Sequence, residues 1–258
     1  MKTVILAGGL GTRLAEETDV VPKPMVAIGG MPIIWHIMKT YYHSAGVTDF
    51  VVCLGYRGYV LKEYFANYAL HAGDVTIDLG KGSFEFMRRG AEPWRVTLVD
   101  TGSASMTGGR LKRIRDLVDG ETFFATYGDG VADVDLPSTL ALHKQHRRMA
   151  TMTAVVPPGR YGALALTEDS RVEAFLEKPP GDGGSINGGY FVLEPEVLDL
   201  IEGDASSFEE ETLPVLAQRG ELFAYRHTGF WHAMDTLRDR RQLEDLWLKG
   251  KAPWKVWE

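Results

Sequence analysis

The strongest constraint on this chain is an apolar run that leads directly into a glycine-rich turn, in the segment VILAGGLGTR at residues 4–13. The run at residues 4–7 is typical of a strand buried on both faces of a parallel sheet. The glycines that follow allow backbone N–H groups to approach a phosphate closely. Arg13 adds a planar guanidinium group, and Lys23, which lies between two prolines, adds a mobile ammonium group. Together they predict a polyphosphate site at the carboxyl end of the first strand.

Two common phosphate-binding motifs do not fit this turn. The dinucleotide-binding pattern G-x-G-x-x-G is absent, because the glycines follow the order G-G-x-G. A Walker A loop needs Gly-Lys-Ser/Thr at its end, where this chain has Gly-Thr-Arg at residues 11–13. A plain strand-to-helix turn is the alternative, and the nearby Arg13 and Lys23 favour phosphate binding over it.

Alternating strand and helix patterns predict an α/β fold. We expect a Rossmann-like, mixed but mostly parallel sheet flanked by helices, with right-handed crossovers and small antiparallel excursions near residues 74–88 and 163–176. No linker or repeat interrupts the pattern, so residues 1–258 are predicted to form one domain. The segments that carry this prediction are strands 4–7, 50–54, 95–99, 122–127 and 150–156 and helices 31–45, 59–70, 111–118 and 237–248.

Composition excludes several classes of function. A net charge of −7 argues against a nucleic-acid surface. No apolar run approaches the ~20 residues that span a membrane, and no signal peptide is visible after Lys2. Cys53 lies alone in an apolar run and is interpreted as a small buried hydrophobic residue. We therefore expect a cytoplasmic, reducing location.

Asp129 is the strongest candidate for a metal ligand. It follows the predicted strand 122–127 and lies between two glycines. In open α/β sheets ligands bind outside the carboxyl ends of the strands. A carboxylate there suits Mg²⁺, which takes one or two carboxylates and keeps several waters. A simple Asp-Gly turn without a ligand is the alternative.

Residues 6–13, together with Pro-Lys-Pro at residues 22–24, resemble the signature of the sugar-phosphate nucleotidylyltransferases. The resemblance extends over essentially the whole chain. It implies transfer of a nucleotidyl group from a nucleoside triphosphate to a sugar 1-phosphate, with release of pyrophosphate. The implied catalytic residues are Arg13, Lys23, Asp129 and Lys178, and the implied nucleotide-binding residues are Leu6, Ala7, Gly8, Gly9, Gly11, Thr12, Arg13, Lys23, Arg110 and Gly128.

Asp235 has two interpretations. Its spacing from the predicted helix 237–248 favours a helix N-cap. The family resemblance implies instead a second Mg²⁺ ligand, and one side chain could fill both roles. The resemblance also implies a sugar-phosphate site made of Tyr161, Gly162, Glu177, Lys178, Asn187 and Gly188.

Within the family, the chain is most similar to the cytidylyl-transferring branch, which uses CTP and glucose 1-phosphate to make CDP-glucose for deoxysugar pathways. The segments at residues 55–59, 100–110, 127–133, 230–238 and 251–254 carry this likeness. Thr-Gly-Gly-Arg at residues 107–110 departs from the motif of the thymidylyl and uridylyl branches. Another sugar or nucleotide, or a non-catalytic sugar-nucleotide sensor, are the alternatives. A dehydrogenase is disfavoured by the missing dinucleotide motif.

Members of this branch form homo-oligomers, and a hexamer is one expectation for this chain. The apolar tail at residues 254–257 and the excursion at residues 74–88 are predicted to pack against neighbouring copies.

Overall fold

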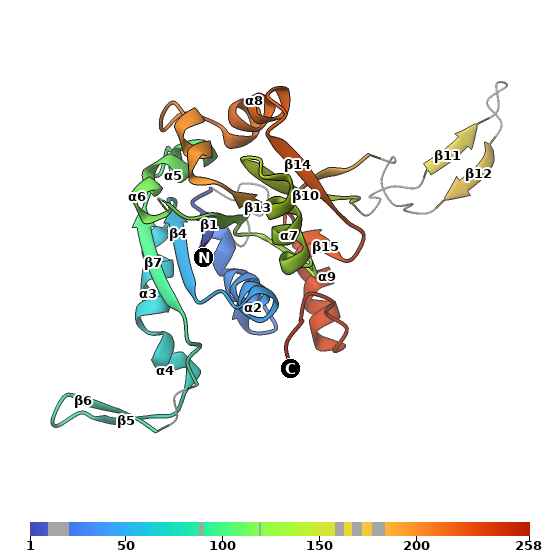
Figure 1. Ribbon diagram of the computed structural model, residues 1–258. Coiled ribbons are helices and arrows are strands. Elements are labelled where there is room, and N and C mark those ends of the chain that lie inside the picture. The colour runs from blue at the N-terminus through green and yellow to red at the C-terminus, as the bar shows by residue number, and fades with distance from the viewer. Residues whose placement is uncertain (10–20, 88–89, 119, 158–162, 167–171, 177–183) are drawn as a thin grey trace.

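A seven-stranded sheet forms the centre of the computed structural model, which describes residues 1–9, 21–87, 90–118, 120–157, 163–166, 172–176 and 184–258 (Figure 1). The strand order is β14-β10-β13-β8-β1-β4-β7, and only β13 runs antiparallel to its neighbours. The predicted mixed but mostly parallel sheet is confirmed. Its strands are β1 (Thr3–Ala7), β4 (Asp49–Leu54), β7 (Arg95–Asp100), β8 (Phe123–Tyr127), β10 (Ala150–Val155), β13 (Ile186–Leu193) and β14 (Leu222–His227).

Strand β1 lies between β4 and β8, near the middle of the sheet. Its residues alternate between two hydrophobic cores, because successive side chains of a strand point to opposite faces. Val4 packs into one core and Ile5 and Ala7 into the other, all of them at most 1% exposed. The apolar run therefore follows from burial on both faces, as the sequence predicts.

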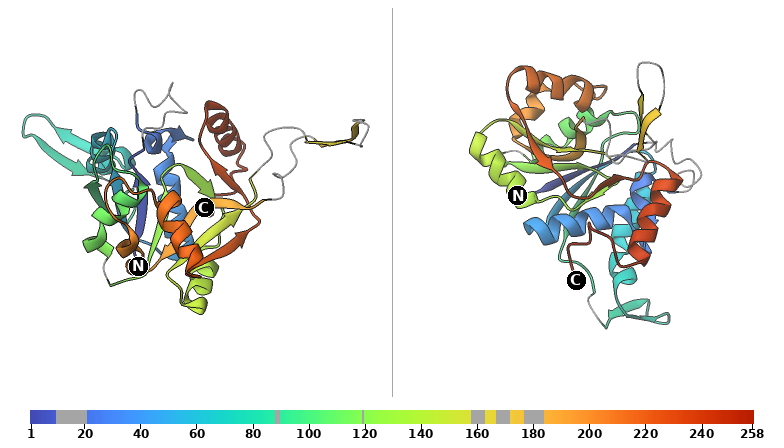
Figure 2. Two further views of the ribbon diagram at one scale, coloured as in Figure 1. Left: turned by 90° about the horizontal axis from the view of Figure 1, so that it is seen from above. Right: turned by 90° about the vertical axis from the view of Figure 1, so that its right-hand side faces the viewer.

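Helices cover both faces of the sheet (Figures 1 and 2). Helices α2, α7 and α9 contribute to the core around Ile5, whereas α5, α6 and α8 contribute to the core around Val4. Helices α3 and α4 lie beside the edge strand β7 (Figure 1). The helices are α2 (Ile33–Ala45), α3 (Gly58–Ala66), α4 (Tyr68–Ala72), α5 (Thr107–Arg113), α6 (Arg115–Val118), α7 (Leu136–His146), α8 (Leu213–Gln218) and α9 (Leu237–Leu248), with short turns of other helix types at η2 (Lys23–Met25), η3 (Pro195–Leu200) and η4 (Phe208–Thr212). None of these described helices combines the length and the hydropathy that crossing a membrane requires.

Four small antiparallel pairs complete the described structure: β2 (Ala27–Ile28) with β3 (Met31–Pro32), β5 (Val75–Asp78) with β6 (Ser83–Phe86), β9 (Gly130–Ala132) with β15 (Trp231–Ala233), and β11 (Ala163–Leu166) with β12 (Val172–Leu176). Both predicted antiparallel excursions are thus confirmed. The β5–β6 hairpin extends away from the sheet and exposes Leu79, Phe84 and Phe86 (Figure 1).

Two predicted helices have different bounds in the structure. The helix predicted at residues 59–70 breaks at Asn67, which ends α3 and begins α4. The helix predicted at residues 111–118 begins earlier, at Thr107, includes Gly108 and Gly109, and is divided at Ile114 into α5 and α6. A Cβ atom on Gly109 would lie 2.4 Å from the carbonyl oxygen of Asp204. These glycines therefore permit close packing against the segment that precedes η4.

The apolar tail packs inside its own chain rather than against a neighbour. Trp254 is fully buried, and Trp257 is 9% exposed against the core formed by α2. The Trp254 indole donates to Nδ1 of His36, at 3.4 Å. The prediction that both tryptophans contact another copy is wrong, because α2 presents an aromatic surface that covers them within the monomer.

Candidate functional site

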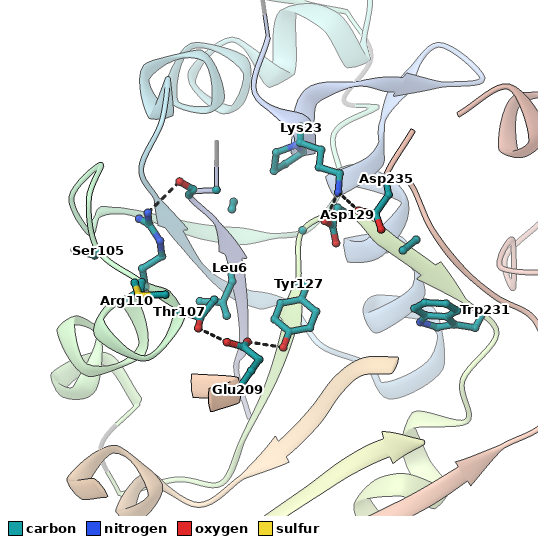
Figure 3. Close-up of a pocket in the computed structure, with 17 residues that line it drawn as sticks. Leu6, Lys23, Ser105, Thr107, Arg110, Tyr127, Asp129, Glu209, Trp231 and Asp235 are labelled. Atoms are coloured by element: carbon teal, nitrogen blue, oxygen red, sulfur yellow. Dashed lines mark hydrogen bonds and ion pairs between the residues drawn. The ribbon is translucent and has the colours of Figure 1, made fainter. Parts of the chain in front are cut away.

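A cavity of about 580 Å³ opens at the carboxyl ends of β1 and β8 (Figure 3). Parallel strands end at the same edge of a sheet, where loops can gather polar groups around a ligand. The cavity brings together these predicted site residues: Leu6, Ala7, Gly8, Gly9, Lys23, Arg110, Gly128, Asp129 and Asp235.

The centre of the site is an ion cluster of Lys23, Asp129 and Asp235 (Figure 3). The Lys23 Nζ atom lies 2.6 Å from Oδ2 of Asp129 and 2.8 Å from Oδ1 of Asp235. The three side chains are mostly buried, at 12%, 31% and 17% exposure respectively. A cation held this closely by two carboxylates, partly shielded from water, makes much stronger contacts than a surface ion pair.

Backbone pairing brings the two carboxylates together. Asp129 directly precedes β9, and Asp235 follows β15, the antiparallel partner of β9. The amide N–H of Met234 donates to the carbonyl of Asp129 at 2.8 Å. Segments more than 100 residues apart in the sequence thus meet at this edge of the sheet.

Asp235 does not cap the helix that follows it. The N-cap of α9 is Thr236, whose hydroxyl accepts from the amide of Asp239, while the Asp239 carboxylate accepts from the amide of Thr236. This capping box satisfies the first turn of the helix. The N-cap interpretation of Asp235 is therefore wrong, and its carboxylate contacts Lys23 in the cavity.

The electrostatics of the cluster favour a charged lysine. Burial alone lowers the pKa of Lys23, but the attraction of Asp129 and then Asp235 outweighs burial and raises that pKa above its ordinary value. The same two carboxylates suit a hard divalent cation such as Mg²⁺, which takes one or two carboxylates and completes its shell with water and phosphate oxygens. Within the described part of the chain, no third acidic, histidine or cysteine side chain joins them.

Arg110 stabilises the glycine turn by hydrogen bonds to backbone carbonyl groups. Its side chain is buried, and its Nη1 atom donates to the carbonyl oxygens of Leu54 and Gly102, at 3.0 and 2.8 Å. Nη2 donates to the carbonyl oxygen of Gly8 at 3.0 Å. A Cβ atom on Gly8 would lie 2.2 Å from this guanidinium group, so the turn requires glycine here. In this arrangement Arg110 holds backbone carbonyls while it also lines the cavity.

A carboxylate that our sequence reasoning missed lies on the cavity wall (Figure 3). Glu209 accepts hydrogen bonds from the hydroxyl of Tyr127, at 2.5 Å, and from the hydroxyl of Thr107. Burial, followed by the Glu209 charge, raises the pKa of Tyr127, which keeps it a hydrogen-bond donor. Glu209 belongs to the π-helical turn η4, a conformation often found at functional sites. Its run of three glutamates resembles an ordinary solvated surface and gave no signal.

A smaller cavity beside the first is lined by Asn187 and Gly188, and it shares Tyr127, Asp129 and Trp231 with the first cavity. The Asn187 amide donates to the Tyr127 hydroxyl at 3.2 Å, and the Trp231 indole donates to the Gly188 carbonyl at 2.7 Å. Two predicted sugar-phosphate residues thus lie next to the ion cluster. Trp231 and Tyr127 are further site residues that the sequence did not single out.

One known protein family matches most of this chain. Residues 2–239 match the model of the nucleotidyl transferase family. The chain belongs to this family. A curated relative from Salmonella typhi, named glucose-1-phosphate cytidylyltransferase, is 61% identical over 259 residues and aligns over 100% of both chains. A probable glucose-1-phosphate cytidylyltransferase from Bacillus subtilis is 42% identical, again over 100% of both chains.

Solved structures share the nucleotidyl transferase fold. The crystal structure of HddC from Yersinia pseudotuberculosis superposes with a TM-score of 0.69 at 24% identity, covering 95% of this chain and 99% of that one. A UDP-glucose pyrophosphorylase complexed with UDP-glucose gives a TM-score of 0.67 at 18% identity, covering 96% and 98%. At these identities the likeness establishes the fold.

The remaining predicted site residues of this nucleotidyl transferase lie outside the residues that the structure describes, so their roles stay predictions. In the nucleotide site they are Gly11, Thr12 and Arg13, and in the sugar-phosphate site they are Tyr161, Gly162, Glu177 and Lys178.

Proposed function

We propose that this protein transfers CMP from CTP to α-D-glucose 1-phosphate, producing CDP-glucose and pyrophosphate. The observation that carries the proposal is the cluster of Lys23, Asp129 and Asp235 beside the glycine turn, in one cavity at the carboxyl ends of β1 and β8. The 61% identity to a relative named glucose-1-phosphate cytidylyltransferase supports CTP and glucose 1-phosphate as the substrates.

The reaction is an in-line displacement at the α-phosphorus of CTP. A phosphate oxygen of glucose 1-phosphate forms a bond to that phosphorus, and the bond to the bridging oxygen of the β-phosphate breaks, so pyrophosphate leaves with the electron pair. The attacking oxygen is already ionised at neutral pH, so no general base is required. Catalysis then depends on positioning the two phosphates and neutralising their charge.

The chain supplies these contributions from its loops. We propose that the backbone of Gly8 and Gly9 and the side chains of Lys23 and Arg13 hold the triphosphate, with Leu6, Ala7, Thr12 and Gly128 around the nucleotide. Arg110 contributes by donating a hydrogen bond to the carbonyl oxygen of Gly8, which holds the turn in place. The position of Gly8, Gly9 and Lys23 on the wall of the larger cavity supports this proposal, and Arg13 and Thr12 are included because of the family resemblance.

Asp129 and Asp235 are proposed to hold Mg²⁺. When bound there, the ion would neutralise charge on the phosphates and on the departing pyrophosphate. Asn187 and Gly188, on the wall of the smaller cavity, are proposed to contact glucose 1-phosphate together with Tyr161, Gly162, Glu177 and Lys178. Because the two cavities share Asp129, both substrates would meet at the ion cluster.

A direct assay tests the activity: pyrophosphate release from glucose 1-phosphate with CTP, UTP, dTTP, ATP or GTP, each with and without Mg²⁺. We expect release with CTP that depends on Mg²⁺. Release with another nucleotide alone would keep the chemistry and overturn the assignment to CTP. No release with any of the five would redirect the test to other sugar phosphates, and binding without turnover would indicate a sensor.

Two variants test the metal site. Asp129→Asn and Asp235→Asn keep the shape of the side chain and remove its charge, so we expect loss of turnover by about 100-fold or more with little change in fold. Glu92→Gln is a matched control, because it neutralises a mostly buried carboxylate that makes a comparable 2.8 Å ion pair, with Lys39, away from this cavity. Normal turnover in either aspartate variant would contradict the metal assignment.

We also propose that residues 1–258 act as one catalytic domain in a cytoplasmic homo-oligomer, with a hexamer as one possible assembly. The exposed apolar residues of the β5–β6 hairpin support an assembly, because such a protruding apolar surface is usually covered by a partner. Light scattering of the purified protein tests it, and a monomer at micromolar concentration would contradict it.

A further inference from the structure

The ammonium group of Lys23 lies between the two carboxylates that the proposed function assigns to Mg²⁺. We propose that Lys23 is an internal counter-cation that is exchanged for the divalent ion, so that metal loading releases its ammonium group toward the phosphates of the nucleotide. The inference rests on the proposed metal site and adds to it a second position, and a second function, for Lys23.

The ammonium group of Lys23 lies against one oxygen of each carboxylate, where a metal ion that bridges the same two oxygens would also bind. Lys23 Nζ is 2.6 Å from Oδ2 of Asp129 and 2.8 Å from Oδ1 of Asp235. A Mg²⁺ ion bound to the same two oxygens would lie about 2.0–2.1 Å from each. Because both positions lie between the same pair of oxygens, the two cations would overlap and repel each other. One must leave before the other binds.

The ammonium group of Lys23 offsets the repulsion between the two carboxylates. Asp129 and Asp235 are brought together by the pairing of β9 with β15, which places two negative charges close together in a partly buried site. Two carboxylates that share a site repel each other unless a cation lies between them. Lys23 cancels that repulsion and keeps the two side chains in the arrangement that a metal ion would use.

The backbone around Lys23 allows the side chain to move while its Cα atom stays in place. Pro22 and Pro24 flank it, and Pro22 has the extended conformation, with φ −65° and ψ 148°. The amide N–H groups of Met25 and Val26 donate to the carbonyls of Pro22 and Lys23, at 2.8 and 3.1 Å. Four flexible side-chain bonds extend from this rigid turn, so the ammonium group can swing from the carboxylates into the cavity.

The released ammonium group of Lys23 would move within the larger cavity. Lys23 lines the cavity together with Gly8 and Gly9, where the triphosphate is proposed to bind. An ammonium group that has lost its carboxylate partners gains most by contacting phosphate oxygens. Binding of the metal and binding of the nucleotide should therefore strengthen each other, as linkage requires for two ligands that favour the same state.

The first test measures Mn²⁺ affinity by calorimetric titration without nucleotide, in wild type and in Lys23→Met. Removing the competing cation should tighten Mn²⁺ binding by about tenfold or more. Lys39→Met, which removes a lysine of similar burial from its pair with Glu92, should leave the affinity unchanged. Unchanged or weaker Mn²⁺ binding in Lys23→Met would overturn the exchange.

A second test uses the wild-type protein, so it does not depend on the folding of a variant. An amine-acylating reagent is applied with and without Mn²⁺, and labelling of each lysine is followed by mass spectrometry. Released from two carboxylates, Lys23 should react several-fold faster with Mn²⁺ present, whereas Lys39 should react at the same rate. Equal or slower labelling of Lys23 in the presence of Mn²⁺ would also overturn the proposal.

The aspartate variants separate this inference from the metal assignment. If Asp129→Asn and Asp235→Asn abolish Mn²⁺ binding while Lys23→Met fails to tighten it, the metal site stands and the exchange is wrong. If Mn²⁺ binds equally well to both aspartate variants, the metal site itself is wrong, and the exchange falls with it.

Discussion

Replacing Arg110 by methionine removes a buried guanidinium group that donates several hydrogen bonds beside the glycine turn. Arg110 is 4% exposed, and its guanidinium group donates to four oxygens. Three of these are backbone carbonyls, those of Gly8, Leu54 and Gly102. Methionine fills a similar length of side chain but offers none of these hydrogen bonds, so the change isolates the donors from the packing.

The expected loss of stability follows from the acceptors that are left behind. The Leu54 carbonyl keeps the hydroxyl of Thr101 as a donor at 2.6 Å, and the Gly8 carbonyl keeps the amide of Tyr56 at 3.3 Å. The Gly102 carbonyl loses a 2.8 Å bond to a charged donor. Since an unsatisfied buried acceptor costs about 1–3 kcal/mol, we expect the free energy of unfolding to fall by about 3 kcal/mol.

Urea unfolding followed by circular dichroism measures this change, and titration of CTP into the folded protein measures the effect on the turn. We expect Arg110→Lys to recover only part of the stability, because an ammonium group cannot reproduce the planar fork that reaches several carbonyls. CTP should bind more weakly to both variants. Arg113→Met is the control: its ion pair with Asp204 lies in water, so its loss should change the stability much less than Arg110→Met does.

A different pattern would refute this reasoning. If Arg110→Met loses less than about 1 kcal/mol of stability while its affinity for CTP falls sharply, and Arg110→Lys binds CTP like wild type, then Arg110 acts on the phosphates directly. Its hydrogen bonds to the carbonyls would then contribute little to the fold.

Three further predictions concern other parts of the molecule. Burial lowers the pKa of His36 to about 4, so protonation favours the unfolded state, and about 3 kcal/mol of stability should be lost as pH falls from 6.5 to 4. In chemical unfolding, His36→Gln should show a shallower pH dependence, and identical profiles would contradict this. Trp254→Ala removes a fully buried side chain and should cost about 3–5 kcal/mol, measured by urea unfolding, whereas a tail that does not contribute to the core would leave the midpoint unchanged. Glu209→Gln removes the charge from the carboxylate on the cavity wall that accepts the hydrogen bond of the Tyr127 hydroxyl. We expect kcat/KM for CTP to fall by about tenfold, which corresponds to one hydrogen bond to a charged group. Glu210→Gln is the control and should stay near wild type.

Local patterns were sufficient where a segment is decided by its own neighbours in the sequence. Four apolar residues followed by glycines predicted β1 and the turn after it, because burial on both faces demands such a run. Asp129 was predicted at a strand end and lies there, beside the cavity. The β5–β6 hairpin was also found from its alternation and its turn.

Local patterns failed where a distant segment decides the outcome. Gly108 and Gly109 were placed before the predicted helix 111–118, but they belong to α5, where the absence of a Cβ atom lets the chain near Asp204 pack against them. The Asp235 carboxylate looked like a cap, although Thr236 and Asp239 share that role through a capping box one residue further on. The tryptophan tail suggested a contact with another copy, while α2 covers it within the monomer.

By itself the sequence determined the layered α/β fold and most of the chemical groups that gather at the strand ends, because periodicity and strand termination are properties of short segments. Only the tertiary structure decided which groups meet. Lys23 contacts carboxylates 106 and 212 residues away, and Arg110 reaches the carbonyl of Gly8 across 102 residues. Such pairings depend on strand order and on loop packing, and no local pattern of residues encodes them.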